Sequence, residues 1–140
     1  MGAALGRAAF PGAVLLLAGP LGAGKTALAR GVARALEVVG PVTSPSFAIL
    51  AVHPGRLPLF HLDLYRVSRP AELRSVDLDE VFGAGGVVVV EWPRWLREQP
   101  PAGALEVEIE IDSPTRRRFL LRARDPRWVE AVTALLGSEG

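Results

Sequence analysis

The chain has 140 residues, of which 49% are apolar, and a formal net charge of +1. This length predicts one domain spanning residues 1–140, and the apolar content excludes an intrinsically disordered chain. The near balance of charge provides no global basic field of the kind that marks nucleic-acid-binding proteins. The absence of cysteine excludes disulfides, thiol nucleophiles and cysteine metal sites.

The N-terminal residues are rich in Ala, Gly and Leu, which raises the alternative of a signal peptide. Cleavage near Ala18 would remove the apolar run 13–18, which is typical of a buried strand before a Gly-rich loop. The apolar runs 13–18 and 87–90 are too short to cross a bilayer. We therefore expect a cytoplasmic protein without a membrane segment.

Residues 24–36 predict an amphipathic helix directly after the Gly-rich loop. The segments 47–53 and 57–66 then predict a β-hairpin. A short helix is expected to begin near Pro70 and to continue through Val76, because proline suits the first turn of a helix. Residues 85–92 predict a second buried strand with an acidic residue at its end.

The last third of the chain has a different pattern. Residues 105–111 alternate between apolar residues and glutamates, which predicts a strand with one exposed face. Residues 117–124 are expected to return antiparallel to it after a turn. Asp125 is then expected to cap a C-terminal helix with Pro126 in its first turn.

Three consecutive arginines, Arg116 to Arg118, allow two interpretations. They could contact tRNA or act as an arginine finger. We favour cross-strand ion pairs with the glutamates of the preceding strand, namely Glu106, Glu108 and Glu110. The tryptophans at positions 92, 95 and 128 are expected by default to be packing residues.

The stretch GPLGAGKT, residues 19–26, fits the pattern G-x-x-x-x-G-K-T of a phosphate-binding loop, or P-loop. Its glycines allow successive backbone N–H groups to point at an anion, and the following helix adds its positive end. Lys25 would reach the β- and γ-phosphates, and the hydroxyl of Thr26 would bind magnesium. The apolar strand before the loop favours nucleotide binding over a chance Gly-rich turn.

Two carboxylates follow apolar runs and are candidates for chemistry. Glu91 could hold a magnesium-bound water, or orient and deprotonate the attacking water; otherwise it is a surface glutamate at a strand end. Asp63 is a second candidate for magnesium, or else it pairs with an arginine such as Arg66. The spacing does not decide between these alternatives.

The residues present and absent bear on the identity of the nucleotide and predict a candidate switch loop. The N-K-x-D motif of guanine-binding GTPases is impossible here, because the chain has no Asn and Lys25 is its only lysine, so ATP is favoured.

The TSPSF segment, residues 43–47, carries the hydroxyls of Ser44 and Ser46. It could close on the γ-phosphate and open after hydrolysis, or it could be an ordinary turn.

Four stretches together resemble the TsaE family, the small P-loop ATPases of bacterial tRNA threonylcarbamoyladenosine biosynthesis. They are LGAGKT (21–26), TSPSF (43–47), HLDLYR (61–66) and VVEWPRWL (89–96). The resemblance implies an α/β, three-layer P-loop NTPase-like fold. Its central sheet would be mixed and mainly parallel, followed by a C-terminal antiparallel hairpin and a helix.

The resemblance also implies an activity and partners. It indicates a magnesium-dependent ATPase that supports the cycling of the proteins TsaB and TsaD, which modify tRNAs that read codons starting with A. The chain would meet tRNA indirectly, through that complex. Two other functions remain open, namely a small-molecule P-loop kinase and a non-catalytic nucleotide switch.

The resemblance assigns roles to individual residues. It places ATP turnover on Lys25, Asp63 and Glu91, and magnesium on Thr26, Asp63 and Glu91. The residues that it places around the nucleotide are Leu21, Gly22, Ala23, Gly24, Lys25, Thr26, Ala27, Ser44, Ser46 and Trp92.

Three features depart from the family pattern. Pro20 stands where the family commonly has Asp, and Ser46 replaces the usual Thr. A first strand expected before residue 13 is predicted to be reduced or missing.

Overall fold

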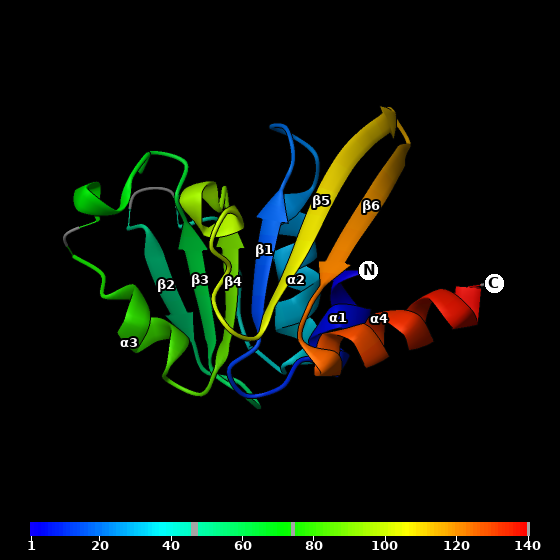
Figure 1. Ribbon diagram of the computed structural model, residues 1–140, viewed down its shortest axis with the longest axis horizontal. Helices are drawn as coiled ribbons and strands as arrows, with labels where there is room; N and C mark the ends of the chain where they lie inside the picture. The colour runs from blue at the N-terminus through cyan, green and yellow to red at the C-terminus, as the bar shows by residue number, and fades with distance from the viewer. Residues whose placement is uncertain (46–47, 74, 140) are drawn as a thin grey trace.

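A computed structural model describes residues 1–45, 48–73 and 75–139 (Figure 1). Its strands are β1 (Val14–Ala18), β2 (Leu50–His53), β3 (Leu59–Asp63), β4 (Val87–Glu91), β5 (Ala104–Ser113) and β6 (Arg116–Ala123). Its helices are α1 (Gly2–Ala8), α2 (Lys25–Ala35), α3 (Leu78–Phe82) and α4 (Pro126–Glu139), with short 3-10 helices η1 (Pro70–Glu72) and η2 (Arg94–Arg97). None of the helices in this described part of the chain is long and apolar enough to cross a membrane.

The strands form one sheet with the order β2-β3-β4-β1-β5-β6. The inner strands β3, β4, β1 and β5 run parallel, and β2 and β6 pair antiparallel at the two edges. The expected mixed, mainly parallel sheet with a C-terminal antiparallel hairpin is thus confirmed. Because the carboxyl ends of parallel strands meet at one edge, the P-loop after β1 lies beside Asp63 and Glu91, which end β3 and β4.

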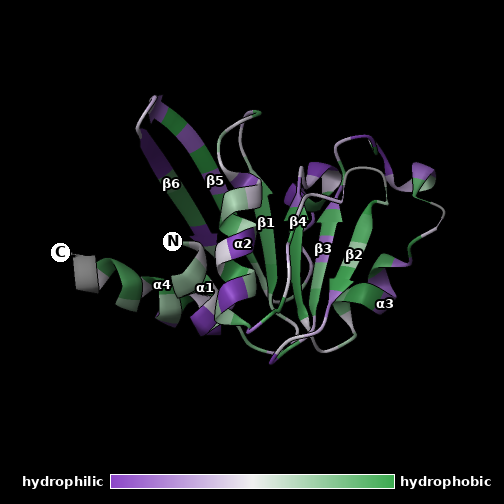
Figure 2. Cartoon of the chain, turned by 180° about the vertical axis from the view of Figure 1, so that it is seen from behind, coloured by the Kyte–Doolittle hydropathy of each residue, from purple (hydrophilic) through white to green (hydrophobic). Residues whose placement is uncertain are grey.

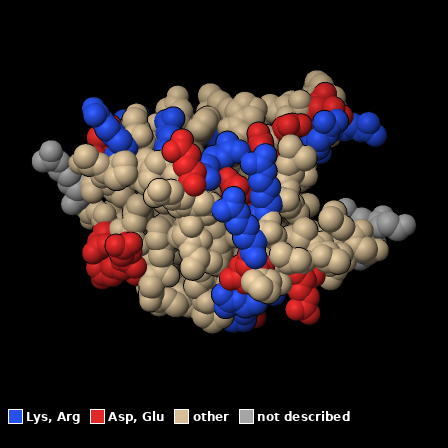
Figure 3. Space-filling view, in the orientation of Figure 1, with Lys and Arg blue, Asp and Glu red and all other residues tan. Residues whose placement is uncertain are grey.

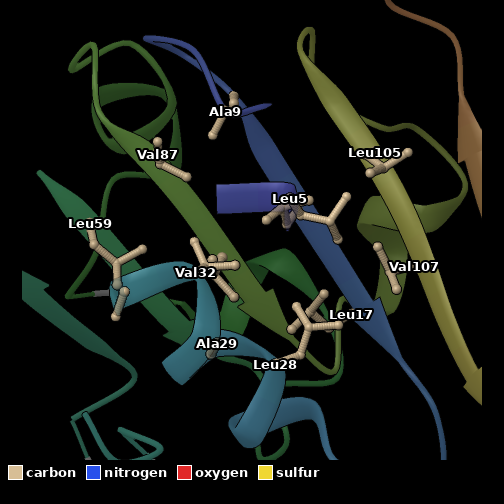
Figure 4. Close-up of a cluster of buried hydrophobic side chains, with 14 of the residues drawn as sticks. Leu5, Ala9, Leu17, Leu28, Ala29, Val32, Leu59, Val87, Leu105 and Val107 are labelled. Carbon is tan, nitrogen blue, oxygen red and sulfur yellow. The ribbon is translucent and has the colours of Figure 1, made fainter. Parts of the chain in front are cut away.

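Helices cover both faces of the sheet, which confirms the three layers (Figures 1 and 2). On one face, α2 packs Leu28 and Val32 against Leu17 and Leu59 (Figure 4). On the other face, a second cluster includes Val81 of α3 packed with strand residues. The inner strands β1 and β4 are buried along their whole length, which explains their continuous apolar sequences.

The C-terminal helix begins as its sequence predicts. The backbone N–H of Arg127 donates to the carboxylate of Asp125 over 2.9 Å, and Pro126 occupies the first turn. Trp128 is fully buried, and its indole N–H donates to the carbonyl of Gly103 over 2.8 Å. The helix is therefore fixed to the end of the sheet by a cap and a buried tryptophan.

Two helical segments differ from the sequence prediction. The helix expected from Pro70 through Val76 ends at Glu72, and α3 is a separate helix. Its N-cap, Asp77, accepts a hydrogen bond from the backbone N–H of Glu80, and such a cap starts a new helix. The N-terminal region forms helix α1, whereas only a reduced or missing strand was expected there.

Helix α1 packs closely on α2 through glycines. A Cβ atom added at Gly31 would lie 3.0 Å from both the backbone nitrogen of Ala3 and the Cα of Gly2. Glycine normally disfavours a helix, so the sequence of α1 does not predict a helix. Here the glycines allow two helix backbones to approach each other.

Substitution of Gly31 by valine is expected to destabilise the fold. The added side chain would meet the backbone of α1, and such overpacking costs about 1–3 kcal/mol of unfolding free energy. Urea denaturation measures this change. Gly137→Ala is the control, because no atom lies within 4 Å of its added Cβ, and it should leave the stability unchanged or raise it. Equal stability of Gly31→Val and the unsubstituted chain would contradict the close packing.

Candidate nucleotide site

The P-loop connects β1 to α2 at the carboxyl edge of the sheet. Gly22 and Gly24 adopt φ angles of 79° and 107°, which L side chains rarely adopt, so glycine is needed at both positions. Gly24 is also the N-cap of α2. The loop therefore presents backbone N–H groups and the positive end of a helix to the same side, an arrangement that suits an anion.

A pocket of about 380 Å³ lies over the loop. It is lined by the predicted residues Leu21, Gly22, Gly24, Lys25, Thr26, Ala27, Ser44, Asp63, Glu91 and Trp92, together with Tyr65, which was not predicted. Ala23 is buried behind the loop. Ser46 lies outside the described residues. The four stretches that carried the resemblance thus meet at one pocket, apart from this residue.

Glu91 contacts two polar side chains at the floor of the site. The hydroxyl of Thr26 donates to its carboxylate, with Oγ1 2.9 Å from Oε1 and 3.1 Å from Oε2. On the other side, Nε2 of His61 lies 2.6 Å from Oε2. Glu91 is only 3% exposed, so it is not the surface glutamate of the alternative interpretation.

Asp63 is held at the end of the neighbouring strand, opposite Glu91 in the register of β3 and β4. The hydroxyl of Ser44 donates to Oδ2 over 2.5 Å, and the backbone N–H of Tyr65 donates to Oδ1 over 2.9 Å. The segment that contains Ser44 was predicted to be a switch loop. Its contact with Asp63 joins that segment directly to the candidate site.

The only lysine of the chain, Lys25, is folded onto the P-loop. Its Nζ donates to the carbonyls of Gly19 and Pro20 over 2.7 and 3.0 Å, and it lies 3.8 Å from the centroid of the Trp92 ring. Burial lowers the pKa of Lys25, while the nearby carboxylates of Glu91 and Asp63 act in the opposite direction. The ammonium group is thus partly desolvated and sits between the loop and an aromatic ring.

The turn after β4 holds Trp92 over the site in a strained backbone conformation. Trp92 and Arg94 both have a φ of 56°, which is uncommon for residues other than glycine. The Trp92 ring packs on Tyr65 with centroids 5.0 Å apart, and the guanidinium of Arg94 donates to the carbonyls of Leu64 and Tyr65. This turn and the turn after β3 therefore fix each other, and the Trp92 side chain both packs on Tyr65 and lines the pocket.

The triple arginine only partly behaves as predicted. Arg118 lies 3.5 Å from Glu110, but Glu106 and Glu108 pair instead with Arg97 of η2, each over 3.4 Å. Figure 3 shows basic and acidic side chains next to each other across this face. The expected pairing is therefore wrong for two of the three glutamates.

Arg117 points to the opposite face from Arg118, because side chains alternate along a strand. Its Nε donates to the carbonyl of Ala23, inside the P-loop, over 3.1 Å. This contact differs from the cross-strand ion pairs that the sequence predicts for all three arginines. The alternation of β6 was the signal that could have separated them.

The oxygen atoms around Thr26 fit magnesium. The hydroxyl of Thr26 and the carboxylate of Glu91 are adjacent hard oxygen donors, and Asp63 ends the next strand. Among the described residues, no group of three or more His, Cys, Asp or Glu side chains could enclose a metal ion. Magnesium usually keeps several waters and binds one or two carboxylates together with substrate phosphates, so such an enclosure is not required.

The fold and the loop define the class of the protein: a small α/β protein with a P-loop at the carboxyl edge of a mainly parallel sheet. The chain belongs to the TsaE family. The sequence model of this family, described as threonylcarbamoyl adenosine biosynthesis protein TsaE, matches residues 1–119. The family acts in the biosynthesis of threonylcarbamoyladenosine in tRNA.

Individual relatives agree with this placement. The tRNA threonylcarbamoyladenosine biosynthesis protein TsaE of Mycobacterium bovis is 42% identical over 129 residues, which cover 85% of this chain and 76% of that protein. The protein of the same name from Streptomyces coelicolor is 40% identical and covers 97% of both chains. The crystal structure of Bacillus subtilis YdiB superposes with a TM-score of 0.78 at 34% identity, covering 99% of this chain and 87% of that one.

Proposed function

We propose that residues 1–140 form one P-loop ATPase domain that binds ATP and magnesium and hydrolyses ATP. The contact between Thr26 and Glu91 in the pocket of Lys25 carries this proposal, because it brings a P-loop hydroxyl and a strand-end carboxylate together beside a cation. Membership of the TsaE family supports a role for this hydrolysis in the threonylcarbamoyladenosine modification of tRNA.

Each residue has a distinct part in the proposed reaction. The backbone N–H groups of the P-loop and the start of α2 bind the phosphates, and Lys25 moves from the carbonyls of the loop to the β- and γ-phosphates. Thr26, Glu91 and Asp63 are the candidates to hold magnesium, which when bound neutralises phosphate charge. Glu91 either binds a magnesium-bound water or orients and deprotonates the attacking water.

A second hollow leaves room for the rest of the nucleotide. It has a volume of about 470 Å³ and lies behind the P-loop, where Gly24, Arg117 and Phe119 are among the lining residues. Because Gly24 and Ala27 line both hollows, one extended molecule could contact both. ATP remains favoured over GTP, because the chain lacks the Asn and the second Lys of the guanine-binding motif.

We further propose that TsaB and TsaD are the partners of the ATPase and that it acts in the cytoplasm. Their complex modifies tRNAs that read codons starting with A, and hydrolysis here supports its cycling. The near-neutral net charge of +1 supports indirect contact with tRNA through the complex rather than strong binding by the isolated chain.

The kinase alternative is less well supported. P-loop kinases generally need an acceptor site and an arginine-bearing lid that closes over ATP, but Arg116 to Arg118 lie on the regular strand β6. Product analysis with γ-labelled ATP and a set of candidate metabolites distinguishes the two functions. Release of inorganic phosphate as the sole labelled product supports the ATPase. Transfer of label to a metabolite would overturn it in favour of the kinase.

A further inference from the structure

His61 is a buried polar side chain for which the proposed reaction has no role so far. It lies in the middle of β3 and is 0% exposed. Its Nε2 contacts Oε2 of Glu91 over 2.6 Å, while its Nδ1 has no hydrogen-bond partner among the described residues. We propose that His61 is a positioning residue that holds the carboxylate of Glu91 in one orientation for ATP hydrolysis. This inference rests on the proposed function.

The strands bring these side chains together. His61 and Asp63 are two residues apart on β3, so their side chains leave the same face of the sheet. His61 is opposite Val89 on β4, and Asp63 is opposite Glu91, which places the imidazole one step deeper in the sheet than the two carboxylates. From there it reaches Glu91 from below, on the side away from the pocket, which His61 does not line.

The contact also defines the proton on the imidazole. A carboxylate oxygen only accepts, so Nε2 of His61 must carry the hydrogen that is donated. In the neutral ring, Nδ1 is then an acceptor without a donor. Leaving a buried acceptor unpaired is unfavourable, and most buried polar atoms are hydrogen-bonded. The fold tolerates it at a residue that contacts the candidate catalytic carboxylate.

The second partner of Glu91 cannot perform the same task throughout the reaction. The hydroxyl of Thr26 donates to Glu91 in the nucleotide-free structure, but in the proposed function its oxygen binds magnesium. The donor, His61, is assigned to neither the nucleotide nor the metal, and its bond to Oε2 leaves Oε1 of Glu91 available to a metal or a water. It is therefore the contact that can persist when the site is loaded.

Turnover of His61 variants tests the role of this bond. His61→Leu removes the donor at similar size and is expected to lower kcat about 10- to 100-fold with little change in ATP affinity, as is typical for partners behind a reacting group. His61→Gln can donate from a similar distance and should restore most of the turnover. His53→Leu is the matched control, because His53 lies on β2 and does not line the pocket. This variant should hydrolyse ATP at the normal rate.

A purely structural role for His61 makes a different prediction. Loss of turnover that tracks loss of thermal stability in both His61 variants, without rescue by His61→Gln, would overturn the proposal. Turnover of His61→Leu equal to that of the unsubstituted chain would also overturn it.

Nitrogen-15 NMR of the nucleotide-free protein tests the contact independently of ATPase activity. The chain has only two histidines, so the His61 signals are identified by their loss in a His61 variant. We expect the Nε2-protonated form, with a clear shift of these signals in Glu91→Gln. An Nδ1-protonated ring, or no change on that substitution, would overturn the positioning role. Inactivity of the unsubstituted chain towards ATP would instead overturn the proposed function, and the NMR result would still stand.

Discussion

Glu91→Gln is expected to abolish most ATP hydrolysis while leaving ATP affinity nearly unchanged. The amide keeps the size of the side chain but cannot take a proton and binds metal less well than a carboxylate. Loss of a positioned general base lowers rates about 100- to 10,000-fold. Phosphate release measures turnover, and calorimetry measures affinity.

A matched control for this substitution lies a few residues along the chain. Glu98 is exposed and lies outside the pocket, so Glu98→Gln carries the same chemical change without the expected loss. Hydrolysis by Glu91→Gln at the rate of the unsubstituted chain would contradict the role of Glu91. If Glu91→Gln lost hydrolysis but still fully supported tRNA modification by TsaB and TsaD, the nucleotide switch would be favoured over the ATPase.

Lys25→Met is expected to weaken ATP binding and to slow turnover further. The methionine preserves an apolar stem beside Trp92 but removes the cation that would contact the phosphates. A hydrogen bond to a charged group contributes about 1.5–3 kcal/mol, which corresponds to about 10- to 100-fold in affinity. Calorimetric titration with ATP and magnesium measures the change.

The stability of this variant provides a second readout. Burial, which lowers the pKa of Lys25, disfavours the ammonium in the folded chain, while its hydrogen bonds to two loop carbonyls favour it, so the substitution should change the melting temperature little. Arg122→Met, an equal loss of charge at an exposed position of β6, should bind ATP normally. Undiminished ATP affinity in Lys25→Met would show that the P-loop lysine does not contact the phosphates.

Much of the site could be predicted because its residues lie at the ends of strongly apolar segments. The runs before Gly19 and Glu91 are typical of buried strands, and parallel strands bring their carboxyl ends together. The roles of Asp63 and Ser44 could not be predicted from spacing alone. Asp63 could be a metal ligand or an arginine partner, and Ser44 could belong to a switch loop or to an ordinary turn. The family resemblance supplied those roles, and the structure places both side chains at the pocket.

Other features depend on contacts that no local pattern contains. His61 meets Glu91 only because β3 and β4 are neighbours in a particular register. Arg117 meets the P-loop only because the C-terminal hairpin extends past it. Helix α1 was not predicted for a different reason. Its glycines lower the helical propensity of the segment, but they allow its backbone to lie close to that of α2.

ATP hydrolysis by the purified chain should be measured with magnesium, first alone and then with TsaB and TsaD added. The proposed function predicts slow turnover alone and a marked rise in the complex, and it predicts that Glu91→Gln removes this rise. No change on adding the two partners would contradict a partner-dependent ATPase, even if the P-loop still bound ATP.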